Sequence, residues 1–337
     1  MKPGTDNTWR SDDLEEAASC PVCSYRDLEP AYAGLVDMEE GVPGEWSMVR
    51  CGRCSSLILS PRPTRRALHK VYRSYYTHLS PDGENAILDA SGMAARAVNA
   101  YLHARYGLGR ADSSLLVVGV VCLWPLRQQL DYFMRHLPRT AGRLLDIGCG
   151  NGGFLQRARR AGWHVIGVEP DPIAASVAQR SADAEVHPNL DALETERFDL
   201  ITLSHVIEHL HDPEGMLQAC RKLLRPGGRL WIATPNIQGL GLRIYGEAWQ
   251  PFETPRHLVM PEANVLKSML ERTGFGDVRF LRRGRGSRKR IAASNERARA
   301  MNNKIFPVAP LAALIDMAAS IAPLGAEELV LVANKRV

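Results

Sequence analysis

The spacing of hydrophobic positions divides the chain into two parts. From Arg143 onward, short apolar runs of strand length alternate with segments of helix length. This alternation predicts a parallel sheet with helices on both faces, and the ligand crevice of such a sheet lies beyond the carboxyl ends of its strands. The pattern therefore predicts an α/β domain whose motifs follow its strands. The expected strands are residues 143–147, 164–168, 184–187, 198–203 and 229–234.

Shorter units surround this α/β core. The first residues are polar and acidic and predict a disordered tail, whereas the segment before the core has the apolar spacing of helices. A long interval before the last strand-like run predicts helices or a lid over the substrate. The expected boundaries are 1–18 for the tail, 19–60 for a cysteine-containing module, 61–135 for a helical linker or lid, 136–285 for the core, 286–325 for a helical insertion and 326–337 for a final core strand.

Four cysteines form two C-x-x-C pairs that predict a metal site. Cys20 and Cys23 are separated by 27 residues from Cys51 and Cys54. Each pair can direct two thiolates at one ion, and four thiolates complete the tetrahedral shell of Zn²⁺ without leaving a position for water. We therefore expect a structural zinc ion, without which the module has too few apolar residues to fold. Redox-active or incidental thiols are the alternative, but no thioredoxin-like context surrounds either pair.

A glycine-rich turn follows the first expected strand of the core. The sequence D-I-G-C-G-N-G-G-F begins at Asp146, and its glycines allow backbone N–H groups to approach a ligand closely. Such a turn alone is weak evidence, because dinucleotide-binding enzymes use a similar one. Asp146, however, would repel a pyrophosphate and can pair with an ammonium group. Glu169, at the end of the second strand, can accept hydrogen bonds from both hydroxyls of a ribose.

A ligand with an amino-acid head and a nucleoside tail matches both carboxylates, and S-adenosylmethionine is such a ligand. From about Arg143 to Phe275 the sequence resembles the class I S-adenosylmethionine-dependent methyltransferases. The resemblance rests on L-L-D-I-G-C-G-N-G-G-F-L, V-I-G-V-E-P-D, F-D-L-I-T-L-S-H-V-I-E-H-L-H-D-P, L-L-R-P-G-G-R-L-W-I-A-T-P-N and T-G-F, in this order. It implies a Rossmann-like, doubly wound sheet of seven strands, completed by residues 276–281 and 328–335, with the last strand antiparallel.

The resemblance also implies which residues bind the cofactor. In this family the glycine turn holds the methionine moiety, and the loop after the third strand reaches the adenine. Family members often have Asp where this chain has Asn189, and an amide oxygen can still accept from the adenine amino group. An ordinary loop is the alternative for this position and the next. The implied cofactor-binding residues are Asp146, Gly148, Gly150, Gly152, Glu169, Asp171, Asn189, Leu190, Ser204 and His209.

The stretch S-H-V-I-E-H-L contains H-x-x-E-H, a spacing that also occurs in zinc peptidases. A peptidase motif must lie on a helix, whereas this one directly follows the expected strand F-D-L-I-T-L. The methyltransferase context places His205 beside the sulfonium, where a neutral imidazole with Glu208 nearby can act as a general base. Some similar O-methyltransferases bind a divalent ion through E-x-x-E-H. Here His205 replaces the first Glu, which weakens the case for a catalytic metal.

A second candidate base, His257, lies in the segment W-Q-P-F-E-T-P-R-H-L. Methyltransferases that resemble this chain often carry a similar P-R-H-L, and the segment is expected to cover the substrate side of the crevice. The alternative is a histidine that only holds its loop by hydrogen bonds. Tyr245 and Trp249 are expected to line the substrate pocket, with core packing as the alternative.

The segment that starts at Cys51 resembles the zinc module ahead of methyltransferase domains that modify sugars or other small metabolites. We therefore expect methyl transfer to a small-molecule acceptor such as a sugar, a nucleotide-sugar or another secondary metabolite. The stretch Arg279–Arg290 carries seven basic residues and leaves RNA methylation as an alternative, although it has one aromatic residue for base stacking. A solvated loop explains the same stretch. A catalytically silent scaffold is disfavoured by the full set of cofactor residues.

Composition fits a globular chain. With 337 residues, 45% of them hydrophobic, it can bury a sizeable core, and its net charge of +5 arises from the basic stretch. No apolar signal segment begins the sequence, so we expect a cytoplasmic location. Because the excess positive charge is confined to one stretch, it does not indicate a nucleic-acid partner, and we expect none. Leu115–Leu126 is shorter than the roughly 20 residues that span a bilayer. The apolar run Leu311–Ile321 leaves peripheral contact with a membrane or a lipid as a further option.

Overall fold

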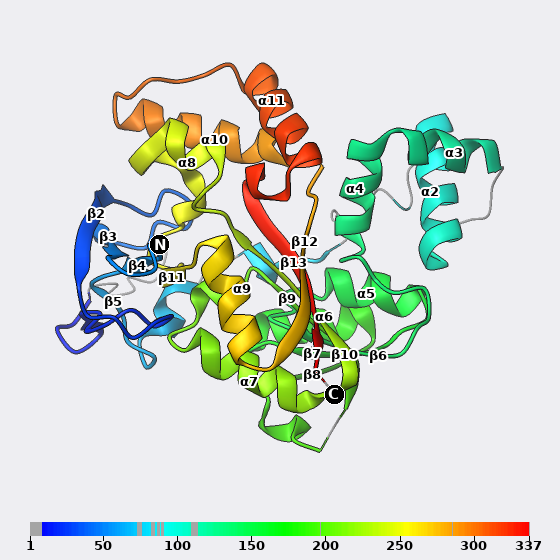
Figure 1. Cartoon of the computed structure of the whole chain (residues 1–337), viewed down its shortest axis with the longest axis horizontal. Helices are drawn as coiled ribbons and strands as arrows, with labels where there is room; N and C mark the ends of the chain where they lie inside the picture. The colour runs from blue at the N-terminus through cyan, green and yellow to red at the C-terminus, as the bar shows by residue number, and fades with distance from the viewer. Residues whose placement is uncertain are drawn as a thin grey trace, which may run out of the picture.

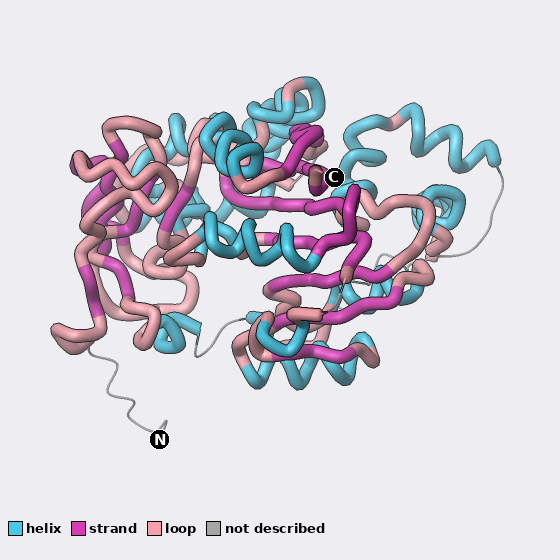
Figure 2. Tube along the Cα trace, turned by 60° about the horizontal axis from the view of Figure 1, so that its bottom comes forward, coloured by secondary structure: helices cyan, strands magenta, loops and turns pink. Residues whose placement is uncertain are grey.

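A computed structural model describes residues 9–72, 76–81, 85, 88, 91–108, 114–195, 197–284 and 286–336 of the chain. A seven-stranded sheet runs through its centre, with the strand order β12-β13-β10-β9-β6-β7-β8 (Figure 1, Figure 2). Neighbouring strands from β10 to β8 in this order are parallel, and β13 is antiparallel to β10 and to β12. This topology confirms the expected Rossmann-like sheet. The strands are β6 (Arg143–Ile147), β7 (His164–Val168), β8 (Glu185–His187), β9 (Phe198–Ser204), β10 (Leu224–Pro235), β12 (Phe275–Leu281) and β13 (Glu328–Lys335).

Two hydrophobic cores lie on opposite faces of this sheet, because successive residues of a strand point to opposite sides. In β9, Ile201 belongs to one core and its neighbour Leu200 to the other, and Ile232 and Trp231 of β10 divide in the same way. Helices α7 and α9 cover the first face, while α4, α5 and α6 cover the second. The helices are α4 (Trp124–Phe133), α5 (Gly153–Arg160), α6 (Pro172–Ala182), α7 (Pro213–Leu223) and α9 (Ala263–Arg272).

The N-terminal module forms a second sheet that includes a strand from the core. Its order is β11-β4-β3-β2, and β11 (Val259–Met260) pairs antiparallel with β4 (Leu57–Leu59). β3 (Trp46–Cys51) and β2 (Leu28–Leu35) complete this sheet. The module is therefore joined by backbone hydrogen bonds to a segment some 200 residues further along the chain, and it does not stand apart as a boundary at residue 60 suggests.

Part of the expected disordered tail is folded against this module. β1 (Leu14–Glu15) pairs antiparallel with β5 (Arg62–Pro63), and the ring of Trp9 packs edge-on against Trp46 at a centroid distance of 5.3 Å. The prediction of disorder is thus wrong for residues 9–18, because their partners lie outside the local sequence. Residues 1–8 lie outside the described part of the chain.

The remaining helices form two groups in space. α2 (Met93–Tyr106) and α3 (Ser114–Cys122) extend to one side beside α4, whereas α10 (Ser287–Ala300) and α11 (Val308–Ile321) pack against the N-terminal sheet (Figure 1). Short helical turns complete the fold: η1 (Leu68–Tyr72), η2 (Tyr76–His78), η3 (Asp191–Leu193), η4 (Ile207–His209), α8 (Leu240–Tyr245), η5 (Gly246–Ala248), η6 (Gln250–Phe252) and η7 (Pro323–Gly325). Within the described residues, no helix has the length and apolar character that crossing a bilayer requires.

Candidate active site

A cavity of about 1060 Å³ lies at the carboxyl ends of β6, β7 and β9. The glycine-rich turn, the residues after β7 and those after β9 form one part of its wall, as a doubly wound sheet predicts. Residues of η1, η2 and the end of α4 form another part, so the expected linker or lid does border the cavity. None of the described residues of 286–325 lines it, and the helical insertion therefore does not cover it as expected.

The glycine-rich turn and Glu169 form one hydrogen-bonded unit. Gly148 and Gly150 have positive φ angles of 68° and 54°, and a Cβ atom on Gly148 would lie 2.5 Å from Val206. The N–H of Gly150 donates to Glu169 Oε2 at 2.9 Å, and the N–H of Asp171 donates to Oε1 at 3.1 Å. Burial raises the pKa of Glu169. Each carboxylate oxygen keeps acceptor capacity for a ribose hydroxyl.

Asp146 lies buried on β6 and has an internal partner that its motif did not predict. Its Oδ1 accepts a hydrogen bond from Thr202 Oγ1 at 2.7 Å and pairs with Arg135. The guanidinium of Arg135 also lies over the Phe154 ring, 4.0 Å from its centroid. Burial raises the pKa of Asp146 despite this cation. Among the described residues Oδ2 has no hydrogen-bond partner, so one buried acceptor remains. Asp146 is not among the described residues that line the cavity, whereas the adjacent Ile147 is.

The other predicted cofactor residues differ in what they contact. Three of them line the cavity: Asn189, Leu190 and Ser204. Asp171 lines it too, but its carboxylate caps α6 and contacts His78 Nε2 at 2.5 Å. Gly152 is not among the described lining residues. A Cβ atom there would lie 2.8 Å from the Cα of Ala178, so this glycine allows α5 and α6 to pack closely.

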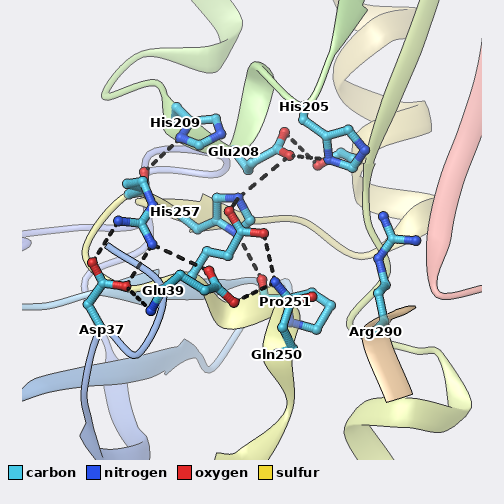
Figure 3. Close-up of polar contacts among 12 residues, drawn as sticks. Asp37, Glu39, His205, Glu208, His209, Gln250, Pro251, His257 and Arg290 are labelled. Atoms are coloured by element: carbon cyan, nitrogen blue, oxygen red, sulfur yellow. Dashed lines mark hydrogen bonds and ion pairs between the residues drawn. The ribbon is translucent and has the colours of Figure 1, made fainter. Parts of the chain in front are cut away.

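His205 is held between two carboxylates at the carboxyl end of β9. Its Nδ1 lies 3.1 Å from Glu208 Oε1 (Figure 3), and its Nε2 lies 2.6 Å from Glu328 Oε1. Burial alone would lower the pKa of this imidazole, but the two carboxylates outweigh it and raise the pKa well above its ordinary value. His205 is therefore a cation at neutral pH. This correction removes it as the neutral base expected from the sequence, because neither ring nitrogen has a free lone pair.

His209 is a neutral imidazole on the cavity wall. Its Nδ1 lies 3.0 Å from the carbonyl oxygen of Arg256 and 2.8 Å from the hydroxyl of Tyr72. Because a carbonyl only accepts, Nδ1 carries the proton and Nε2 the lone pair. Burial, followed by the nearby His257, lowers the pKa of His209 to about 4. The sequence predicted a cofactor contact for this residue, and the structure gives it the properties expected of a base.

His257 lies behind His209, with the two rings edge-on at a centroid distance of 4.7 Å. Its Nδ1 donates to the carbonyl oxygen of Pro251 at 2.8 Å, and its side chain is buried. His257 and Glu208 are absent from the described residues that line the cavity. The two residues expected to do chemistry with His205 therefore support the wall instead of forming it.

Tyr245 and Trp249 lie away from the cavity, contrary to the expectation that they line a substrate pocket. The hydroxyl of Tyr245 donates to Asn295 Oδ1 at 2.9 Å, and Trp249 Nε1 donates to Glu327 Oε2 at 2.9 Å. Both rings belong to the hydrophobic core beneath α10 and α11. The packing alternative is correct for these two residues, because their polar atoms are used to hold neighbouring helices and strand ends.

Comparison with known proteins agrees with this geometry. Residues 125–279 match the sequence profile of a family described as a methyltransferase domain. This part of the chain is a class I S-adenosylmethionine-dependent methyltransferase domain. The seven-stranded sheet, its antiparallel final strand and the motifs at the strand ends were expected from the same resemblance.

Curated relatives match about a third of this chain. The ubiquinone biosynthesis O-methyltransferase of Xylella fastidiosa is 33% identical over 117 residues, which cover 32% of this chain and 48% of that protein. The protein of the same name from Cereibacter sphaeroides is 37% identical over 123 residues, covering 34% and 50%. The chain thus spans about half the length of these relatives. A methyltransferase structure from Archaeoglobus fulgidus is 20% identical, covers 66% of this chain and 100% of its own, and has a TM-score of 0.44.

The four cysteines ahead of the methyltransferase domain converge as their spacing predicted. Cys20 Sγ lies 3.6 Å from Cys54 Sγ, Cys23 Sγ lies 3.5 Å from Cys51 Sγ, and all four sulfurs lie within 4.8 Å of one another. All four are free thiols. Thiolates around tetrahedral Zn²⁺, with Zn–S bonds of about 2.3 Å, are separated by about 3.8 Å. The cluster therefore fits a zinc ion with no open position.

A second group within the methyltransferase domain has metal-ligand chemistry. One atom from each of Glu208, His209 and His257 lies within 4.8 Å of the others. Both histidines direct Nδ1 at a backbone carbonyl, which is the usual orientation of metal-bound imidazoles. Burial alone would raise the pKa of Glu208, but His205 lowers it to about 2, so the carboxylate is ionised. These three residues can hold a divalent cation, whereas His205 faces Glu328.

Sequence reasoning missed several residues that shape this site. Tyr72 reaches His209 across 137 positions, and Glu328 reaches His205 across 123. No local motif marks such pairs, because each depends on two distant elements meeting. One signal was present: two adjacent acidic residues, Glu327 and Glu328, begin an otherwise apolar strand, and buried charges at such a position need partners.

Proposed function

We propose that the protein transfers the methyl group of S-adenosylmethionine to a hydroxyl group of a small-molecule acceptor. The main support is that one cavity joins Glu169 and the glycine turn to the neutral imidazole of His209, so that cofactor and acceptor would share a single enclosed space. The curated relatives that match the domain are O-methyltransferases by name. The acceptor class we favour is a sugar, a nucleotide-sugar or another small metabolite, and we include a structural zinc ion in the four-cysteine cluster.

The two carboxylates would orient the cofactor. Glu169 would accept from the ribose hydroxyls, and the buried Oδ2 of Asp146 would accept from the ammonium group. Burial raises the pKa of both carboxyls, which means that the surrounding protein groups do not fully compensate their charged forms. Hydrogen bonds from the cofactor would supply that compensation. Asn189 and Leu190 would contact the adenine.

The methyl-transfer step requires few catalytic groups from the protein. The cofactor supplies an activated methyl group, and most of the rate then comes from holding the acceptor oxygen in line with it. His209 is our candidate to receive the acceptor proton, because it lines the cavity, is neutral at pH 7 and has a free lone pair on Nε2. A base with a pKa of about 4 binds a proton weakly, so we expect its effect near the lower end of the roughly 10²- to 10⁴-fold range of general bases.

A divalent cation at Glu208, His209 and His257 would supply Lewis-acid activation of the same oxygen, and His209 would then be its ligand. His205 touches neither reactant in this proposal. It is a positioning residue that fixes the carboxylate of Glu208 and the end of β9. Measurement of Mn²⁺ binding to the zinc-loaded protein distinguishes a metal-ligand role of His209 from a proton-acceptor role.

RNA methylation has less support than it had from the sequence. Arg283 and Arg290, two of the seven basic residues in the stretch 279–290, form ion pairs with the buried Glu328 at 2.8 and 2.5 Å. They therefore do not present their charge to phosphates. A silent scaffold is disfavoured, because the cavity is lined by the glycine turn and Glu169, which would bind the cofactor.

The first test is isothermal titration of the purified protein with S-adenosylmethionine and S-adenosylhomocysteine, with zinc measured in the same sample. We expect binding of both nucleosides and about one zinc ion per chain. Transfer of a labelled methyl group into libraries of sugars, nucleotide-sugars and other hydroxylated metabolites then identifies the acceptor class. Absence of binding to both nucleosides in zinc-loaded protein would disprove the proposal, and methylation of RNA but of no small molecule would replace it with the alternative.

A further inference from the structure

A buried ion pair joins the N-terminal module to loop 249–258, which carries His257. Arg256 Nη1 lies 2.7 Å from Asp37 Oδ2 and Nη2 lies 2.9 Å from Oδ1, so the pair is bidentate (Figure 3). Both side chains are 0% exposed. Burial alone would raise the pKa of Asp37, but the guanidinium outweighs it and lowers the pKa, which keeps the pair charged. Two fully buried charges in this geometry accept little displacement of either partner.

Asp37 is itself fixed by the turn between β2 and β3. Its carboxylate accepts from the N–H groups of Glu39 and Val42, both at 3.1 Å. The neighbouring Glu39 accepts from Gln250 Nε2 at 2.8 Å and from Arg297 Nη2 at 3.2 Å. The module therefore holds the loop at two points and contacts α10 as well. Each of these contacts comes from a turn whose position depends on the N-terminal sheet.

The other side of the loop holds the cavity wall. The carbonyl oxygen of Arg256 accepts from His209 Nδ1 at 3.0 Å, and the N–H of Leu258 donates to the carbonyl oxygen of Glu208 at 2.7 Å. The first contact sets the tautomer of His209, and the second fixes the turn that carries its backbone. Asp37 is thus separated from the cavity imidazole by a single residue, Arg256.

Backbone hydrogen bonds also join loop 249–258 and β11 to β4, the strand that follows the second cysteine pair. The N–H of Leu59 donates to the carbonyl oxygen of Leu258 at 3.0 Å, next to the pairing of β4 with β11. β4 begins three residues after Cys54, and the turn before it contains Cys51. One small sheet therefore carries the metal cluster at one end of β3 and the Asp37 turn at the other.

We propose that the N-terminal module is a part of the acceptor site, in which Asp37 is a positioning residue that fixes His209 and His257 through Arg256. This inference rests on the proposed function, since the loop matters for catalysis only if an acceptor binds beside it. A buried ion pair adds little net stability compared with apolar residues of similar volume, whereas it restricts the geometry of its partners. The module thus fixes the positions of His209 and His257 relative to the cavity. Asp37 itself touches neither cofactor nor acceptor.

The test uses the zinc-loaded full chain with Asp37→Asn. We expect hydrogen exchange of the Leu258 amide to accelerate about tenfold or more, because the loop that covers it is no longer fixed. Nitrogen NMR of His209 should change from one tautomer to a mixture, a signature that a purely stabilising pair would not alter. Affinity for S-adenosylhomocysteine should stay within about threefold, because the glycine turn and Glu169 do not contact the module.

The matched control is Asp13→Asn. Asp13 is also a buried N-terminal carboxylate, but it pairs with Lys70 at 2.6 Å and accepts from the N–H of Arg10 at 2.9 Å, both of which lie outside loop 249–258. We expect this variant to leave the Leu258 amide and the His209 tautomer unchanged. An equal effect of both variants would mean general loosening of the module and would overturn the proposal.

The Asp37→Asn variant can also bind the nucleoside with no change in the loop, or it can fail to fold. If Asp37→Asn binds the nucleoside normally and neither exchange nor tautomer changes, the proposal is wrong. If that variant does not fold, Glu39→Gln replaces it, because Glu39 is partly exposed and holds Gln250. Unchanged exchange in the loop of this second variant overturns the proposal equally. Failure of wild-type protein to bind the nucleoside would refute the proposed function alone, since the exchange comparison remains valid without a ligand.

Discussion

His205 and Glu328 are 123 residues apart in the sequence, yet Nε2 of the histidine lies 2.6 Å from Oε1 of the glutamate. Arg283 binds Oε2 of the same carboxylate at 2.8 Å, and Arg290 binds Oε1 at 2.5 Å. Burial alone would raise the pKa of Glu328, but these cations hold it well below the ordinary range. Glu328 is therefore the shared anion of three cations, and it accounts for two of the seven basic residues in the stretch 279–290.

Replacing Glu328 should lower the free energy of unfolding. Glu328→Gln leaves three buried or half-buried cations without their common partner, and we expect a loss of about 3–5 kcal/mol in the free energy of unfolding. Glu214→Gln is the control, because Glu214 forms a more exposed ion pair with Arg272 at 2.6 Å and should lose about 1 kcal/mol or less. Urea unfolding of both variants gives the comparison, and similar losses in the two would contradict the assigned role.

Glu169→Gln should weaken cofactor binding without unfolding the domain. The substitution removes the negative charge that would accept from two ribose hydroxyls, and charge-assisted hydrogen bonds contribute about 1.5–3 kcal/mol, or about 10- to 150-fold in affinity. Titration with S-adenosylhomocysteine measures this. Glu185→Gln, an exposed residue of β8, should bind as wild type does. Unaltered affinity in the Glu169 variant would show that the ribose is held elsewhere.

Stability should fall between pH 6.5 and 5 because of His209. Its pKa is lowered to about 4 in the folded chain, so in this window the unfolded state takes up a proton that the folded state does not. At about 1.4 kcal/mol per unit, the free energy of unfolding should drop by about 2 kcal/mol across the window. His209→Gln should make this slope shallower without removing it, because burial also lowers the pKa of His136 to about 4, while His69→Gln, an exposed histidine at the cavity, should retain the wild-type slope. Denaturant unfolding at several pH values measures both, and a wild-type slope in the His209 variant would refute the assignment.

Zinc content distinguishes the clustered cysteines from the others. If the cluster holds zinc as proposed, Cys54→Ser should remove it and lower the thermal midpoint, because metal-binding free energy in such a site contributes to folding. Cys122→Ser, which alters an exposed free thiol on α3, should keep about one zinc per chain. Elemental analysis of both proteins after gel filtration is sufficient. Wild-type protein without zinc would end the structural-zinc hypothesis.

A divalent cation should bind at Glu208, His209 and His257 when the cysteine cluster already holds zinc. Mn²⁺ is the probe, because it prefers carboxylate and imidazole over thiolate ligands. Electron paramagnetic resonance should show one bound Mn²⁺ per chain that His257→Gln removes and His69→Gln retains. If no Mn²⁺ binds to the zinc-loaded protein, His209 acts in its neutral, metal-free form.

The sequence by itself determined the central sheet, the convergence of the four cysteines and the strand ends at which the cavity lies. A short apolar run such as residues 198–203 is a local signal, because a strand packed on both faces, as Leu200 and Ile201 of β9 are, is apolar at successive positions. The two C-x-x-C pairs and the glycine turn are local in the same sense. Each is a short segment whose backbone geometry its own residues impose, and so its chemistry can be predicted from spacing.

Only the tertiary structure decided how the charged groups of the site are distributed. The protonation of His205 depends on Glu328, the neutrality of His209 depends on burial, and the position of Arg256 depends on Asp37. In each case a pKa or an orientation is set by a partner more than 100 residues away or by exclusion of water, and neither is encoded in the neighbouring residues. The sequence could therefore name the histidines of this methyltransferase domain, while their roles follow from what the fold places around them.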